Sequence, residues 1–180
     1  MEIPHFIHEI ATDFVEFLWW AWTRDESVPA GAGDLFYSDP APMATEFVGD
    51  YAGSYKNTAF FIGPGGQNLP TVVLETGFLE SAVNSTNDKD MWFQGTGGVT
   101  RVVIFINTIR GDGGYAVFLE VWTRRGYQRA RVYPRLVEGE SDPVLDISDL
   151  WGAVPVPAGY GGNQLTLSRE DLKGCLTKVA

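Results

Sequence analysis

The segment "TRVVIFINTI", residues 100–109, is an almost continuous run of β-branched and apolar side chains. Such a run is typical of a strand that is buried on both faces of a sheet, because it leaves neither face polar enough for water. The turn "GDGG" (111–114) and a second apolar segment, "YAVFLEVWT" (115–123), come next, and this order favours a hairpin. We therefore expect residues 100–109 to form the central strand of a sheet.

Three more segments near this centre have strand character. The segments "NTAFFIG" (57–63) and "PTVVLETGF" (70–78) are separated by the turn "PGGQN". In "RARVYPRL" (129–136) the arginines alternate with other residues, so Arg129 and Arg131 are predicted to share one face of a strand. These segments add further strands to the predicted sheet.

Three helices are predicted, one near each end of the chain and one between strands. Residues 6–23 repeat apolar positions at helical spacing, and residues 80–93 are polar with spaced apolar positions. The last helix covers residues 168–179, with Ser168 as its N-cap and Asp171 at the capping-box position.

Two segments carry weaker patterns. The segment "DLFYS" (34–38) is a candidate for a short strand, and residues 141–163 are rich in turn residues. Taken with the stronger elements, the order is helix, strands, helix, strands. We therefore expect an α/β (α+β) domain, in which a mixed β-sheet is flanked by helices.

Composition fits one globular domain. The chain has 180 residues, of which 44% are hydrophobic and 20% charged, enough for a substantial core. The single cysteine, Cys175, excludes a disulfide framework within one chain. No apolar run approaches the length that spans a bilayer, and the first residues carry acids and histidines where a signal peptide carries Lys or Arg. We expect an intracellular protein, cytoplasmic or nuclear, without a membrane partner.

Charge is distributed unevenly along the chain. The formal net charge of −10 disfavours a nucleic-acid partner, because the overall field repels phosphates. Most of the arginines nevertheless fall between residues 101 and 135. They form either a solvated hairpin face or a local patch for phosphate or a protein partner, with Arg129 and Arg131 as candidate phosphate contacts.

Glycine-rich turns do not indicate a nucleotide loop. Both "GPGG" (63–66) and "GTGG" (95–98) lead into a strand, whereas a phosphate-cradling loop leads into a helix. Neither turn is therefore predicted to bind phosphate in that way.

Glu75 is the residue that raises a functional question. It ends the apolar run Val72–Val73–Leu74, and a carboxylate at the end of a buried strand is costly unless something pairs with it. Glu75 is therefore either a structural carboxylate, exposed or bonded to the backbone, or a group held for chemistry. Metal-dependent phosphodiester cleavage requires carboxylates that converge on one point, and neighbouring strands can supply them.

The spacing from Glu75 through Ser81 to Asp88 and Trp92 resembles that of fungal proteins with a PD-(D/E)XK nuclease-like core, which look like distant relatives of the bacterial Uma2-type endonuclease-like proteins. The resemblance spans about residues 56–174. Its matched positions are Pro70, Glu75, Gly77, Glu80, Ser81, Asp88, Trp92, Val102 to Ile106, Glu120 and Trp122. It implies that residues 1–180 form a single PD-(D/E)XK-like domain with a restriction-endonuclease-like sheet.

The resemblance also implies a set of roles. Mg²⁺ or Mn²⁺ would bind Glu75 as the main ligand and Asn57 as a weaker one, with Asp88 assisting and Lys89 stabilising charge on phosphate. The first helix would contribute Glu9 or Glu16. Asn57 replaces the acid that the family usually carries, and Gly77 stands where the wider superfamily has its lysine. The expected activity is thus a divalent-metal-dependent nuclease with a degenerate active site.

Two other functions remain open from the sequence. The first is a non-catalytic protein-interaction or self-association module that keeps the nuclease-like fold, with a homodimer formed through the Trp-rich end of the first helix, Trp19, Trp20 and Trp22. The second is a small acidic protein that mimics nucleic acid. Glu80 and Ser81 fit a helix start as well as they fit a catalytic role.

Overall fold

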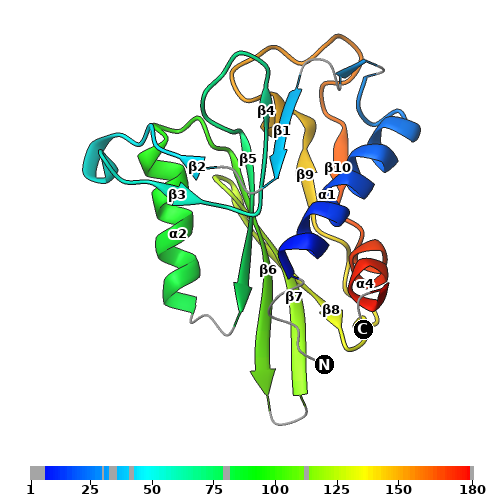
Figure 1. Cartoon of the computed structure of the whole chain (residues 1–180). Coiled ribbons are helices and arrows are strands. Elements are labelled where there is room, and N and C mark those ends of the chain that lie inside the picture. The colour runs from blue at the N-terminus through cyan, green and yellow to red at the C-terminus, as the bar shows by residue number, and fades with distance from the viewer. Residues whose placement is uncertain are drawn as a thin grey trace.

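The computed structural model describes residues 7–29, 31–32, 36–40, 43–78, 82–111 and 114–178 (Figure 1). Its main sheet has six strands in the order β1-β4-β5-β6-β7-β8. Their bounds are β1 (Phe36–Pro40), β4 (Phe60–Pro64), β5 (Val72–Phe78), β6 (Val102–Gly111), β7 (Gly114–Thr123) and β8 (Gly126–Tyr133). The expected mixed sheet is confirmed.

Only one neighbouring pair of strands in this sheet, β5 and β6, is parallel, among the residues described. A parallel pair requires a crossover, and helix α2 (Ala82–Gly95) supplies it. Strand β6 pairs with β5 on one side and β7 on the other, and its residues from Val102 to Thr108 are buried. The central position predicted for residues 100–109 is therefore confirmed.

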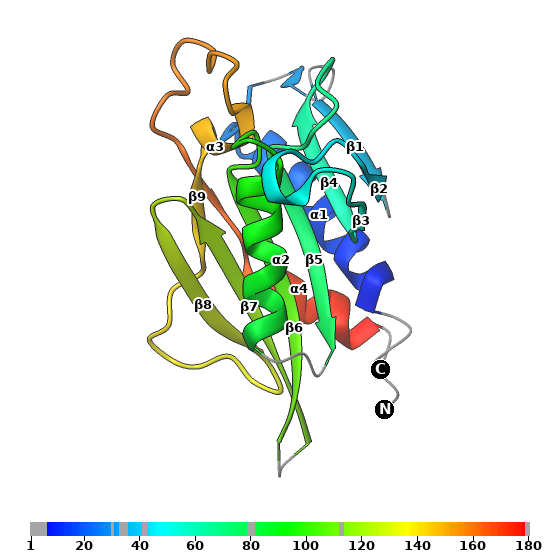
Figure 2. The ribbon, with the colours of Figure 1, turned by 90° about the vertical axis from the view of Figure 1, so that its left-hand side faces the viewer.

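The two faces of the sheet are covered by different helices. Helices α1 (Ile7–Arg24), α3 (Ile147–Trp151) and α4 (Arg169–Lys178) pack on one face, in a core that includes Leu74 and Ile104. Helix α2 packs on the opposite face, over a smaller cluster that includes Val73 and Phe105 (Figures 1 and 2). Because side chains alternate along a strand, each residue of β5 belongs to one of these two layers.

Two short sheets lie outside the main one. Strands β2 (Met43–Ala44) and β3 (Lys56–Asn57) form one, on either side of the short 3-10 helix η2 (Gly49–Tyr51). Strands β9 (Val144–Asp146) and β10 (Gln164–Thr166) form the other. The strand predicted at 57–63 is thus divided between β3 and β4, and the turn-rich segment 141–163 contains β9 and α3, which the sequence pattern did not predict.

The helix predictions agree with the described elements. Helix α1 matches the predicted segment 6–23 closely, and the amide of Asp171 donates to Ser168 Oγ over 3.2 Å at the start of α4. Among the described residues, no helix combines the length and apolar character needed to cross a membrane.

The three tryptophans of α1 are not equivalent. Trp22 is buried, and its Nε1 donates to the carbonyl of Thr166 over 2.9 Å. Trp19 is partly buried against the core, whereas Trp20 is 54% exposed with Arg24 stacked on its ring. Most of the indole surface at this end of α1 therefore belongs to the core.

Candidate functional site

Glu75 lies on the α2 face of β5, opposite Phe105 of β6. Only 7% of its surface is exposed. The layer around it is apolar, with Phe61, Val73 and Trp92 in the same cluster. A carboxylate in such a layer needs hydrogen bonds or a counter-charge to offset its desolvation.

Two side chains provide most of this compensation, and the Thr58 hydroxyl adds a smaller contribution. Trp92 Nε1 donates a hydrogen bond to Glu75 Oε1 over 2.7 Å, and Lys56 Nζ lies 3.8 Å from the same oxygen. Trp92 comes from α2 and Lys56 from β3. Glu75 is therefore held from two sides by groups that favour its charged form.

Asp88 completes the arrangement as a second acid. Its Oδ2 lies 2.7 Å from Lys56 Nζ, so one ammonium lies between the carboxylates of Glu75 and Asp88. Asp88 and Trp92 are four residues apart on α2 and share the helix face that meets the sheet. We call Glu75, Lys56, Asp88 and Trp92 the Glu75 cluster.

Burial is the largest influence on the Glu75 carboxyl and raises its pKa to about 7. The positive charge of Lys56 and the hydrogen bond from Trp92 act in the opposite direction, and the charge of Asp88 raises the pKa further. Glu75 therefore takes up a proton far more readily than an ordinary glutamate.

A divalent metal does not fit the Glu75 cluster in this arrangement. Magnesium and manganese require several oxygen ligands around one point, but here the ammonium of Lys56 lies between the two acids. Within the described part of the chain, no group of three or more His, Cys, Asp or Glu side chains is placed to hold a metal ion. The cluster is an acid–lysine–acid arrangement with one hydrogen-bonding indole.

Two residues predicted beside Glu75 lie elsewhere. Asn57 is exposed on β3, and because neighbouring strand residues point to opposite sides, it faces away from the direction that Lys56 takes. Lys89 pairs with Asp90 over 2.8 Å and lies over the ring of Trp122. It is about 100° around α2 from Asp88, which directs it away from Glu75.

The acids predicted from the first helix are not brought to the site either. Glu9 and Glu16 are exposed on α1, and α1 packs on the face of the sheet that carries Leu74. Glu75 belongs to the opposite face, so the sheet itself separates these residues from the Glu75 cluster.

The candidate phosphate contacts on β8 are engaged within the protein. Arg129 Nε lies 3.2 Å from Glu120 Oε1, and its guanidinium stacks over Phe118. Arg131 also lies over Phe118, and its backbone amide donates to Glu140. Glu120 is thus a buried acid with its own counter-charge.

The structure brings Glu75 and Asp88 to one lysine, Lys56, as the resemblance implied for the two acids but not for the lysine. One feature of the sequence did indicate such a partner, because a buried glutamate is costly without a nearby cation. The resemblance includes Trp92 among its matched positions but implies no role for it. Glu80 and Ser81 lie outside the described residues.

No protein-family model and no curated protein matches the chain.

Proposed function

We propose that this chain is a PD-(D/E)XK-like domain that has lost metal-dependent cleavage and acts as a non-catalytic interaction module. The observation that carries the proposal is the position of Lys56, whose ammonium lies 2.7 Å from Asp88 and 3.8 Å from Glu75. A positive charge between two acids neutralises the site that a metal would require.

The architecture supports the nuclease-like part of the proposal. A helix precedes three antiparallel strands, β1, β4 and β5, and a second helix then leads to the parallel strand β6. Helices cover both faces of this mixed sheet. Glu75 stands in the middle of β5, on the face covered by the helix that carries Asp88.

Exposed apolar side chains support the interaction part. Met43, Val48 and Tyr55 are 61%, 50% and 71% exposed, and all three fall in the segment that runs from β2 to β3. Concentrations of exposed apolar groups are typical of contact surfaces. Lys56 lies in this segment, as the first residue of β3, so a partner bound there would lie next to the Glu75 cluster.

A second candidate function is the metal-dependent nuclease itself. It is favoured by the convergence of Glu75, Asp88 and Lys56, since two acids and a lysine are the residue types that such an active site employs. In that case Lys56, and not Lys89, would stabilise the charge that develops on phosphate. Metal binding would then have to displace Lys56 from between the acids.

Cleavage assays separate the two functions. Wild type, Glu75→Ala and Glu120→Ala are incubated with single- and double-stranded DNA and with RNA, in Mg²⁺ and in Mn²⁺. Glu120 is the matched control, because it is equally buried (7% exposed) and paired with Arg129. The proposal predicts equal, background rates for all three proteins. Cleavage by wild type and Glu120→Ala but not by Glu75→Ala would establish the nuclease.

The interaction role is tested by sedimentation. If the segment from β2 to β3 mediates self-association, Tyr55→Ser combined with Met43→Ser shifts the protein towards monomer, whereas Trp20→Ser on α1 does not. A shift towards monomer caused only by Trp20→Ser would instead indicate that the first helix mediates self-association.

A further inference from the structure

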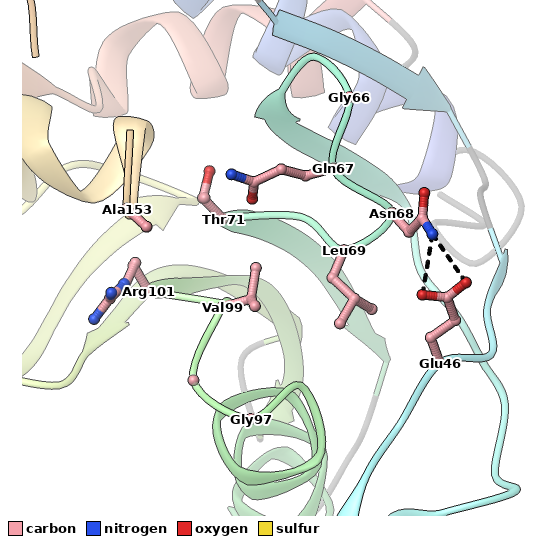
Figure 3. A pocket seen from close by; sticks show the side chains of 11 residues that line it. Glu46, Gly66, Gln67, Asn68, Leu69, Thr71, Gly97, Val99, Arg101 and Ala153 are labelled. Carbon is pink, nitrogen blue, oxygen red and sulfur yellow. Dashed lines mark hydrogen bonds between the residues drawn. The ribbon is translucent and has the colours of Figure 1, made fainter. Parts of the chain in front are cut away.

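A cavity of about 520 Å³ lies where β5 begins, on the N-terminal side of Glu75. Its walls come from the loop before β5, the loop after α2 and the start of β6, with Gln67, Asn68, Leu69, Val99 and Arg101 among the lining residues (Figure 3). Its volume is in the range that accommodates small organic ligands. Thr71 lines it four residues before Glu75, which corresponds to about 13 Å along the strand.

The two glycine-rich turns of the sequence meet at this cavity. Gly66 comes from the turn before β5, and Gly97 and Gly98 come from the turn after α2. Because glycine has no side chain, these residues leave the backbone accessible and the space in the cavity unfilled. Gly98 has a φ of +86°, and a Cβ there would collide with the guanidinium of Arg124. A glycine at this position therefore allows Arg124 to lie against the cavity wall.

The cavity has charge of opposite sign at its two ends. Asn68 donates to both carboxylate oxygens of Glu46, over 3.1 and 3.2 Å, and keeps that acid at one end (Figure 3). Arg101 lies at the other end, with the apolar side chains of Leu69 and Val99 between them (Figure 3). The acid is thus held apart from the arginine.

The arginine end has unused donor capacity. Arg101 Nε is buried and has no hydrogen-bond partner among the described residues. Its charge acts on the carboxylate of Asp149, but that acid already forms an ion pair with Arg125. Arg124 donates one hydrogen bond of 3.3 Å to the carbonyl of Phe93. Buried donors without partners are costly, and a guanidinium presents a planar fork that matches an oxyanion.

We propose that this cavity is a binding site for a small organic anion. A carboxylate or phosphate group of the ligand binds Arg101, with Arg124 at the rim, and its body lies over Leu69 and Val99 within reach of the Gln67 amide. The site includes neither Glu75 nor Lys56. A negative result for this cavity would therefore leave the proposed loss of catalysis unaffected, and the reverse also holds.

The test uses the full chain and ¹H–¹⁵N NMR, with the Arg Nε–H signals as direct reporters. The probes are inorganic phosphate, adenosine 5′-monophosphate and an N-acetylated tripeptide with a free carboxylate. Adenosine and the corresponding tripeptide amide are the uncharged counterparts. The phosphate-bearing and carboxylate-bearing probes distinguish the two sources of the oxyanion.

The proposal predicts that at least one charged organic probe shifts the Arg101 Nε–H signal and the amides of Gly97 and Gly98. Its uncharged counterpart binds at least about tenfold more weakly. Arg101→Gln weakens the charged probe by about tenfold or more, whereas Arg110→Gln does not. Arg110 is the control, because it is exposed and lies near the far end of β6, whereas Arg101 directly precedes that strand.

Three results would overturn the proposal. The first is that no charged probe at 10 mM, about the limit of weak binding, shifts the Arg101 signal. The second is that charged probes and their uncharged counterparts bind equally well. The third is that Arg101→Gln binds the charged probe as well as wild type does. If Arg101→Gln fails to fold, Arg124→Gln provides the same comparison at the rim, and unchanged binding there would count equally against the site.

Discussion

The indole of Trp92 on α2 and the carboxylate of Glu75 on β5 are joined by a hydrogen bond of 2.7 Å between Nε1 and Oε1. Both side chains are buried, and the bond crosses from helix to sheet inside an apolar layer. Phe61 meets the Trp92 ring edge-on, and Phe47 packs at a tilt beside it. The hydrogen bond therefore fixes the position of α2 on the sheet as well as the orientation of Glu75.

Trp92→Phe is expected to lower the free energy of unfolding by about 2 kcal/mol or more, because a buried acid loses a hydrogen bond and the smaller ring leaves space. Trp122→Phe is the control. Trp122 Nε1 is buried without a hydrogen-bond partner among the described residues, so Trp122→Phe loses no hydrogen bond and is expected to cost less than Trp92→Phe. Urea unfolding at pH 8 measures the free energy of unfolding of both variants and of wild type. Equal losses for the two variants would show that the Trp92 hydrogen bond contributes nothing.

Glu75 gives stability a defined pH dependence. Its pKa is raised to about 7 in the folded state, against about 4.3 for an unfolded glutamate. Between these values the unfolded chain releases a proton that the folded protein keeps. The carboxyl's contribution to stability is thus greatest below the lower pKa, falls as pH rises to about 7, and is constant above it.

Glu75→Gln removes this titration. The stability of the variant relative to wild type is expected to rise between pH 4.5 and pH 7.5, by up to about 3 kcal/mol. Urea unfolding of both proteins at four pH values in this window measures the difference, in which all other titrating groups cancel. A difference that does not change with pH would contradict the raised pKa.

Arg169 anchors the segment before β9 to helix α4. It is 7% exposed and pairs with Asp142 over 2.8 Å and with Glu140 over 3.1 Å. Arg169→Met leaves both acids without their counter-charge and is expected to cost about 3 kcal/mol. Arg24→Met, in an exposed pair with Asp25, is expected to leave stability nearly unchanged, because solvent screens that pair. Thermal unfolding that ranks the variants in the reverse order would contradict this assignment.

The sequence predicted the elements whose periodicity is strong. The apolar run at 100–109 and the helical spacing at 6–23 each leave one plausible structure, and both were found. The pattern failed where elements are very short. Strands β3, β9 and β10 have two or three residues, and pairing over such lengths is decided by tertiary contacts.

The candidate site was predicted in part for a similar reason. Asp88 and Trp92 lie one helical turn apart, so their shared direction towards β5 follows from sequence spacing. Which lysine would meet Glu75 depended on the path of the chain from β3 to β5, and the pattern carried no information on it. The resemblance implies a role for Glu9 or Glu16, but the sequence pattern does not determine which face of the sheet α1 covers.

The position of Lys56 is tested most directly by thermal unfolding of wild type, Lys56→Met and Lys89→Met at pH 8, with and without MnCl₂. Lys89 is the control, because it lies next to Asp88 in sequence but pairs with Asp90. Without its ammonium, Glu75 and Asp88 repel each other, so Lys56→Met is expected to unfold at a lower temperature than wild type and to be stabilised by Mn²⁺. Wild type and Lys89→Met should show no comparable Mn²⁺ effect. Stabilisation of wild type by Mn²⁺, together with its loss in Lys56→Met, would contradict the account and assign Lys56 to a working metal site.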